Sequence, residues 1–403
     1  MAGLACARTL SAAGVGVRIL EASDGVGGRV RSDMVDGFIL DRGFQILLTA
    51  YPELQRWFTL DELDLRRFHP GATIWTGTRF TNIGDPLRRP LDLPSTVLSP
   101  VGTIADKFRL LRLIASVRRG SVPDLLRRRD MSTAARLESA GFSQRFIDQF
   151  FTPLYSGIQL DPHLEVSSRR FEVILRMLAV GDSAVPAAGM GSLSDILAAG
   201  LAPDVVQCNS AVRRIEGTTA HLESGEKVSG GSLVVATQGS VASQLLGLPD
   251  PGSRPVAAIW FDTTSAPVHG KRILLDGASS GPMKNLAVLS DVAPSYAPKG
   301  KALSVAAVPG PSALSTTLEA DVRAQLRTWG LEPNGWETIR VDVIAHGQPL
   351  QLPPLDPRRS VRLGDRRYVC GDHRDTASLQ GALFSGRRAA AAILADLGEP
   401  GRA

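Results

Sequence analysis

Near the start of the chain a carboxylate and a glycine-rich turn lie close together in sequence. Glu21 ends a short β-rich run, and the turn D-G-V-G-G-R follows at residues 24–29. A carboxylate about 20 residues after a glycine at a helix start accepts hydrogen bonds from ribose hydroxyls, and Gly3 lies at such a spacing before Glu21. Glycines in these turns let the backbone approach a pyrophosphate closely. The pattern therefore predicts a nucleotide-binding site.

Two elements must position this carboxylate. Residues 2–13 carry small and apolar side chains at helical spacing, and Gly14 is a typical stop. Residues 15–23 follow as a short strand that contains the acid. Helix, turn, strand and carboxylate form the second half of a dinucleotide-binding β-α-β unit, in which the fingerprint G-x-G-x-x-G opens the helix. We expect Gly3 to be the last glycine of that fingerprint.

The first strand of such a unit and its first two glycines have no counterpart in the sequence, which opens as Met1-Ala2-Gly3. A missing central strand leaves buried backbone groups unpaired, at about 1–3 kcal/mol for each unmet hydrogen bond. We therefore expect the native reading frame to begin upstream, with a segment like V-x-V-x-G-x-G. The alternative is a shortened gene product that binds its nucleotide poorly.

The stretch E-A-S-D-G-V-G-G-R at residues 21–29 resembles the E-A-x4-G-G-R pattern of the FAD-binding flavoprotein amine oxidase superfamily, which includes phytoene desaturases and protoporphyrinogen oxidases. In that superfamily the glutamate binds the adenosine ribose, and the Gly-Gly-Arg turn lies along the pyrophosphate. The resemblance gives these roles to Glu21, Ala22, Gly27, Gly28 and Arg29.

The C-terminal residues 367–397 resemble the closing motif of the same superfamily: a strand, G-D, a loop, and S-L-x-G-A-x-x-S-G-x-x-A-A. The resemblance implies that the aspartate contacts the ribityl or pyrophosphate part of FAD. It also implies that the start of the last helix points backbone N–H groups at the flavin ring, where a helix dipole stabilises developing negative charge. The residues implied here are Gly371, Asp372, Leu379, Gln380 and Ala382.

Two internal stretches extend the resemblance. Residues 185–197 match P-x-x-G-M-G-x-L-x-x-x-L, and the segment after G-G-R passes close to the flavin in relatives. Residues 205–215 are predicted to form a strand whose backbone contacts adenine in relatives. The site residues implied are Gly43, Phe44, Gln45, Val212 and Ala236, although core packing is an equal alternative for Phe44.

The resemblance implies an α/β fold with a discontinuous Rossmann-like FAD-binding domain, built on a parallel sheet with helices, and a mixed α+β substrate domain. The expected FAD-binding segments are residues 1–50, 185–254 and 353–403, and the expected substrate-domain segments are residues 51–184 and 255–352. The first insertion is predicted to be largely helical because residues 104–119 carry apolar side chains at i, i+3 and i+4. The second insertion is predicted to form an antiparallel sheet with one helix over residues 315–329. Residues 142–158 are rich in aromatic side chains and predict a Pro/Gly turn at their end.

The resemblance also implies the cofactor, FAD, and a reaction class. We expect hydride abstraction from a C–N or C–C bond of a small, largely apolar substrate, with reoxidation by oxygen or another acceptor. Lys284 is the candidate catalytic residue, because a lysine holds a water near the flavin in many amine oxidases; an exposed lysine at a strand end is the alternative. An aromatic cage beside the flavin cannot be located in the sequence. A second hypothesis is a non-enzymatic binding protein on this fold, as in Rab GDP-dissociation inhibitors, and flavin absorbance distinguishes the two.

Composition sets the remaining expectations. The chain has 403 residues, a formal net charge of +5 and three cysteines far apart in sequence, so we expect neither a disulfide framework nor a metal site. No signal-peptide pattern and no apolar run of about 18 residues occurs, so we expect a cytoplasmic location. We expect a small-molecule substrate and no nucleic acid; the oligomeric state is open. The arginines of residues 104–129 suit anionic lipid, but a solvated helical face is the favoured interpretation.

Overall fold

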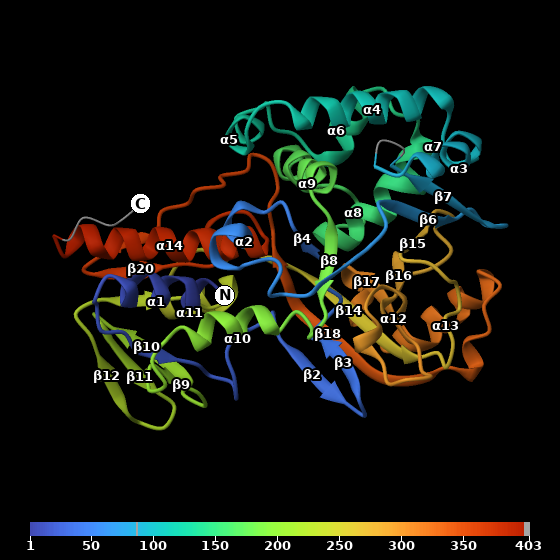
Figure 1. Ribbon diagram of the computed structural model, residues 1–403. Coiled ribbons are helices and arrows are strands. Elements are labelled where there is room, and N and C mark those ends of the chain that lie inside the picture. Colours follow the sequence, from blue (N-terminus) through green and yellow to red (C-terminus); the bar gives the residue numbers. More distant parts are fainter. Residues whose placement is uncertain (86–87, 399–403) are drawn as a thin grey trace.

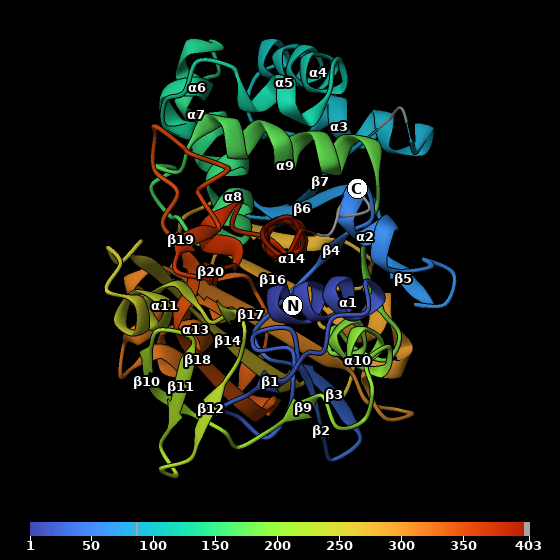
Figure 2. The same cartoon turned by 90° about the vertical axis from the view of Figure 1, so that its left-hand side faces the viewer.

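Two β-sheet regions and a cap of helices build the molecule (Figure 1). The computed structural model describes residues 1–85 and 88–398. A view turned by 90° shows the helical cap, α3 to α9, at one end and the strands β10 to β12 at the other (Figure 2). The domain boundaries given above stay a prediction, and residues 86–87 and 399–403 of the expected segments lie outside the described residues.

The larger sheet has seven strands in the order β18-β14-β17-β16-β15-β6-β7. All neighbours pair antiparallel except β15 and β6, which are parallel. The predicted helix is present as α13, Leu318–Thr328, which packs its apolar face on the sheet. The prediction for the first insertion was incomplete, since its strands β6 and β7 extend this sheet. The strands are β6 (Gly71–Trp75), β7 (Phe80–Gly84), β14 (Ser253–Asp262), β15 (Ile273–Asp276), β16 (Asn285–Val288), β17 (Leu303–Pro309) and β18 (Glu337–Pro349).

The side of the molecule built from the segments that the sequence predicts to bind FAD, which we call the nucleotide side, contains short parallel pairs instead of one continuous sheet. β1 (Ile19–Leu20) pairs with β9 (Val206–Gln207), and β13 (Leu233–Val235) pairs with β20 (Arg367–Val369). Within the described residues no hydrogen bond joins β1 to β13 or β20, and a large cavity reaches between them. The predicted strand over residues 15–23 is therefore shorter than expected, and the one over residues 205–215 is divided between β9 and β10.

Smaller strands complete this side. β10 to β12 form an antiparallel meander, β2 and β3 form a hairpin, and β8 pairs with β4 and β5. β19 pairs antiparallel with β20. Their bounds are β2 (Ser32–Val35), β3 (Phe38–Asp41), β4 (Leu47–Leu48), β5 (Leu65–Arg67), β8 (Ser183–Pro186), β10 (Val212–Glu216), β11 (Thr219–Leu222), β12 (Lys227–Ser229) and β19 (Arg362–Gly364).

The first and last helices pack against each other through small side chains. α1 (Ala2–Ala12) and α14 (Leu379–Asp396) approach so closely that a Cβ at Gly386 would lie 2.2 Å from the carbonyl oxygen of Ala2. Only small side chains fit at such a short distance, which explains why both helices are rich in alanine and glycine. Two further helices, α10 (Ser192–Ala199) and α11 (Gly239–Leu246), also belong to this side.

The helical cap contains α3 (Leu93–Leu98), α4 (Ile104–Arg118), α5 (Val122–Leu126), α6 (Thr133–Ser139), α7 (Gln144–Phe146), η2 (Ile147–Phe151), α8 (Thr152–Gln159) and α9 (Ser168–Val180). Contrary to the predicted turn, residues 152–159 are helical, and the π-helical turn η2 joins α7 to α8. Pro153 lies at the second position of α8, directly after the π-helical turn η2, so the regular i→i−4 hydrogen bonding is already interrupted where its N–H is missing. The remaining short helices include α2 (Pro52–Trp57) and α12 (Leu289–Val292).

One buried carboxylate fixes the start of α4. Asp106 accepts hydrogen bonds from the amide and hydroxyl of Thr103, both at 2.8 Å, and from the amide and hydroxyl of Ser143, at 2.8 and 2.7 Å. Burial alone would raise the pKa of Asp106, but these hydrogen bonds outweigh it and lower the pKa to about 2. The ionised side chain thus joins the start of α4 to the start of α7.

We expect Asp106→Asn to lower the free energy of unfolding by about 2 kcal/mol at pH 7, because a pKa below that of the unfolded chain stabilises the fold above about pH 4. The same stabilisation is lost as the pH falls from about 4 to about 2, so the difference from wild type should narrow in that range. Urea unfolding at several pH values measures this. Asp124→Asn, which removes a similar but exposed cap on α5, is the control and should cost less; a loss at Asp106 that is independent of pH would contradict the account.

Candidate active site

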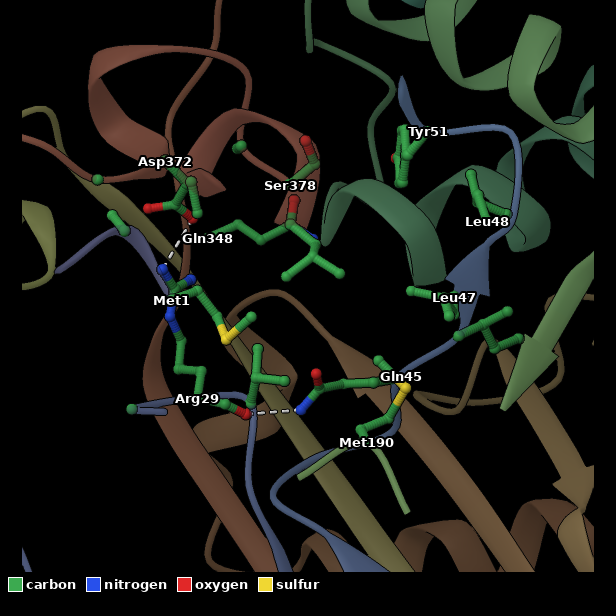
Figure 3. Close-up of a pocket in the computed structure, with 18 of the residues that line it drawn as sticks. Met1, Arg29, Gln45, Leu47, Leu48, Tyr51, Met190, Gln348, Asp372 and Ser378 are labelled. Carbon is green, nitrogen blue, oxygen red and sulfur yellow. Dashed lines mark hydrogen bonds and ion pairs between the residues drawn. The ribbon is translucent and has the colours of Figure 1, made fainter. Parts of the chain in front are cut away.

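A cavity of about 1740 Å³ lies between the nucleotide side, the larger sheet and the helical cap. This volume exceeds the roughly 300–1,000 Å³ typical of a pocket for one small ligand, so a cofactor and a second molecule fit together. One arm reaches between β1 and β13, the centre contains the glycine turn and the start of α14, and an outer arm reaches α3 and α4. Figure 3 shows part of the wall.

Glu21 lies directly after β1, where the parallel pairing with β9 holds the backbone. Its amide donates to the carbonyl of Gln207 at 2.9 Å. Its Oε1 accepts from the amide of Ser23 at 2.9 Å and from the Ser23 hydroxyl at 2.8 Å. The side chain lines the cavity, so its carboxylate is positioned to accept hydrogen bonds from ribose hydroxyls.

The glycine turn requires glycine for two reasons. Gly27 and Gly28 have φ values of +107° and +62°, a region that residues with a Cβ rarely adopt. A Cβ at Gly27 would lie 2.5 Å from the Ser194 hydroxyl, whereas one at Gly28 would meet nothing within 4 Å. No atom therefore covers the backbone of Gly28 on its open side. Close approach of a phosphate requires such an uncovered backbone.

An ion pair joins this turn to the C-terminal G-D motif. Arg29 Nη2 donates to Asp372 Oδ2 at 2.7 Å (Figure 3). The carbonyl of Arg29 accepts from Gln45 Nε2 at 2.7 Å. The Ser385 hydroxyl of α14 accepts from the amide of Gly371 at 3.0 Å. Segments from the two ends of the chain are thereby held around one part of the cavity.

The start of α14 presents free backbone donors. The hydroxyl of Ser378 caps the helix by accepting from the amide of Gly381 at 3.1 Å. The amides of Leu379 and Gln380 have no hydrogen-bond partner in the described part of the chain, and Leu379 lines the cavity. An 18-residue helix with free N–H groups at its start attracts negative charge.

These features fit a dinucleotide with a pyrophosphate. A carboxylate lies where a ribose would bind, uncovered glycine backbone and Arg29 lie where phosphates would bind, and Leu379 brings the start of α14 to the cavity wall. FAD bound here supplies the redox chemistry, and the protein supplies orientation and electrostatics.

A second polar group lies in the wall formed by α8, α9 and the larger sheet. Arg170 is buried; its Nη2 donates to Gln348 and to the carbonyl of Ala377, while its Nε and Nη1 have no partner. The Tyr155 hydroxyl and the Asn285 Oδ1 are also buried without partners. Arg170, Tyr155, Asn285 and Gln348 all line the cavity.

No acidic side chain of the described residues pairs with Arg170. Burial lowers the pKa of its guanidinium to about 10, so it remains charged at neutral pH. A buried charge without a counter-ion is costly. This part of the wall is therefore suited to an anionic ligand group.

The structure brings nearly all the predicted cofactor residues together. Those that line the cavity are Gly3, Glu21, Ala22, Gly27, Gly28, Arg29, Gly43, Phe44, Gln45, Val212, Ala236, Gly371, Asp372, Leu379 and Ala382. Gln380 does not line it; its Oε1 accepts from the amide of Glu53 at 2.8 Å. Lys284 does not line it either, and its Nζ donates to the carbonyl of Gly281 at 3.3 Å. The next residue, Asn285, lines the cavity instead of Lys284.

Sequence reasoning missed the polar wall, although one signal was available. Arg170 precedes the buried residues Val173, Ile174 and Met177 by three, four and seven positions, so it lies on the apolar face of α9. A charged residue on such a face predicts a buried charge that belongs to a functional site. Nothing comparable marks Tyr155 or Asn285, whose place depends on how α8 packs on β16.

A model of the family described as flavin containing amine oxidoreductase matches residues 1–394. This chain belongs to that family. The enzyme is therefore an oxidoreductase, and its cofactor is FAD.

Three relatives illustrate the likeness. Putrescine oxidase from Kocuria rosea is 44% identical over 89 residues, which are 21% of this chain and 18% of that protein. Protoporphyrinogen oxidase 2 from Arabidopsis thaliana is 32% identical over 111 residues, 28% of this chain and 22% of that protein. The matches thus span about a fifth of either curated relative. The structure of an oxidoreductase from Methanosarcina mazei superposes with a TM-score of 0.72 at 16% identity, covering 96% of this chain and 97% of the other.

Within residues 1–85 and 88–398, no group of three or more His, Cys, Asp or Glu side chains is arranged to hold a metal ion. In the same part of the chain, no helix has the length and apolar character needed to cross a membrane.

We expect Glu21→Gln to weaken FAD binding about tenfold, because it removes one charge-assisted hydrogen bond to the ribose. Titration of the FAD-free protein, followed by flavin fluorescence, measures the dissociation constant. Glu62→Gln changes an exposed glutamate outside the cavity and should leave it unchanged. Equal affinities of the two variants would contradict the assignment of Glu21.

Proposed function

We propose that this flavoenzyme oxidises a C–N or C–C single bond of a small, largely apolar substrate that ends in a carboxylate, and passes the electrons to oxygen or another acceptor. The observation that supports it is the outer arm of the cavity, whose wall from η2, α8 and α9 to α3 and α4 is mainly apolar, with Thr96 and Lys107 as its polar side chains on α3 and α4. Its apolar lining includes Leu93, Val97, Leu110, Ile114, Phe146, Phe150, Phe151, Leu154, Ile158, Ile174 and Leu178.

The polar wall is the evidence for a carboxylate on the substrate. Arg170 offers two unpartnered nitrogens, and Tyr155 and Asn285 carry unpartnered polar atoms at the same cavity. Guanidinium and carboxylate groups match in charge and in bidentate geometry. Figure 3 places Gln348, the partner of Arg170, near Ser378 at the start of α14, so an anchored substrate would lie beside the free amides that we assign to the flavin.

A cytoplasmic location is part of this proposal. Cys6, Cys208 and Cys370 are all free, and Cys6 and Cys370 are buried. Free thiols are typical of proteins that work in a reducing compartment. The substrate partner is a small molecule.

The visible spectrum of the purified protein, before and after FAD is added, tests the cofactor and the reaction in turn. We expect a flavin spectrum that survives gel filtration and bleaches, without oxygen, when an apolar carboxylate with an oxidisable C–N or C–C bond is added. A stable flavin spectrum that only polar or cationic compounds bleach would contradict the substrate class. A protein that stays colourless would fit either the non-enzymatic binding protein or a shortened gene product that binds FAD poorly, and restoring the upstream residues would distinguish the two.

We expect Arg170→Met to reduce the affinity of the FAD-loaded enzyme for octanoate about tenfold or more, because a charge-assisted hydrogen bond contributes about 1.5–3 kcal/mol. Perturbation of the flavin absorbance measures binding. Octanamide, the neutral counterpart, should bind both proteins equally, and Arg170→Lys should restore part of the preference for octanoate. If octanoate and octanamide lose affinity in parallel, Arg170 supports the fold only.

A further inference from the structure

An exposed apolar surface covers α3, its preceding turn and the first half of α4. Leu91 and Leu98 are 89% and 79% exposed, and Ile104 and Phe108 are both 64% exposed. Single exposed apolar residues are ordinary, but a contiguous group marks an interaction surface. We name these residues the α3–α4 patch: Leu91, Leu93, Val97, Leu98, Ile104, Phe108 and Leu111.

The patch is separate from the side of α4 that builds the core. Ile104, Phe108 and Leu111 are spaced i, i+4 and i+7, which places them on one face. Leu113 and Val117 are buried in the core shared with α9. Since α4 already has a buried face, folding does not require its exposed apolar face.

The patch surrounds an end of the cavity. Leu93, Val97, Ile104, Phe108 and Leu111 belong to the patch and also line the cavity. Figures 1 and 2 both show α4 in the outermost layer of the helical cap, far from β10 to β12. The outer arm therefore reaches solvent through apolar side chains.

Positive charge accumulates beside the patch. Residues 88–129 contain ten Arg and Lys side chains and three Asp, a net charge of +7 in a chain whose total is +5. The three aspartates already have partners: Asp92 pairs with Arg272, Asp106 accepts the four hydrogen bonds described above, and Asp124 pairs with Arg127.

Four of these cations, Arg112, Arg118, Arg119 and Arg129, have no side-chain partner in the described part of the chain. Arg112, Arg118 and Arg119 are exposed, and no side-chain hydrogen bond or ion pair involves them there. Helical spacing places Arg112 and Arg118 near the face of Ile104, toward the C-terminal half of α4. One face of α4 therefore carries an apolar first half and a cationic second half.

We propose that the α3–α4 patch docks on an anionic lipid bilayer. The apolar side chains insert below the headgroups, Arg112, Arg118 and Arg119 contact lipid phosphates, and the cavity opens toward the membrane. An apolar ligand then enters the outer arm without crossing water. Charge favours this occupant over a second copy of the chain, because a symmetric dimer would bring the unpaired arginines of two copies together.

Vesicle flotation of the FAD-loaded enzyme tests docking without reference to turnover, so its failure is distinct from failure of the proposed function. We expect the enzyme to float with vesicles of phosphatidylcholine that contain about one quarter phosphatidylglycerol. It should not float with phosphatidylcholine alone, and about 1 M salt should release it.

Two pairs of variants separate the apolar and cationic contributions. Phe108→Ser should reduce binding about tenfold, whereas Met34→Ser, which changes a residue of similar exposure on β2, should not. Arg118→Gln/Arg119→Gln should weaken binding in the same way, and Arg213→Gln/Lys227→Gln on the distant meander should not.

Three outcomes would overturn the proposal. They are absence of flotation with anionic vesicles, equal flotation of the Phe108 and Met34 variants, and a dimer in sedimentation that Phe108→Ser dissociates. The last outcome would assign the patch to a second copy of the chain.

Discussion

The ion pair between Arg29 and Asp372 is the contact on which the cofactor site depends. These residues are 343 positions apart in the chain, and each follows a turn that only glycine forms easily. Gln45 holds the carbonyl of Arg29, and the Ser385 hydroxyl of α14 holds the turn before Asp372. The turn after β1 and the start of α14 are thereby fixed on opposite sides of the same space, and the larger sheet and the helical cap close the rest of it.

The two halves of the cavity differ in what they can bind. Around the ion pair the wall offers a carboxylate, bare backbone and free amides, which suit the phosphates and ribose of FAD. Beyond the start of α14 the wall becomes mainly apolar, and it contains a buried guanidinium that has no acidic partner. Continued outward, the same apolar lining becomes the exposed surface of α3 and α4. In our proposal, cofactor, substrate anchor and entrance therefore follow one another along a single cavity.

The parts predictable from sequence are those in which local backbone chemistry decides the outcome. Gly27, Gly28 and Asp372 belong to short motifs whose turns require their own residue types, and all three line the cavity. Lys284 shows the limit: a strand alternates its faces, and sequence did not reveal that Asn285, the next residue, would reach the cavity. The short length of β1 was also not predicted. The strand ends where its pairing with β9 ends, and not where the β-propensity of the sequence ends. The parallel pairing of β15 with β6 joins segments that are far apart in the chain, and neither sequence indicates that the other is its partner.

A double-mutant cycle on FAD affinity tests the central claim most directly. The dissociation constant would be measured for wild type, Arg29→Met, Asp372→Asn and the double variant. If the ion pair organises the site, the two losses are not additive, with a coupling energy of about 0.5–3 kcal/mol, as for residues in direct contact. Additive losses, or unchanged FAD affinity in both single variants, would contradict this account.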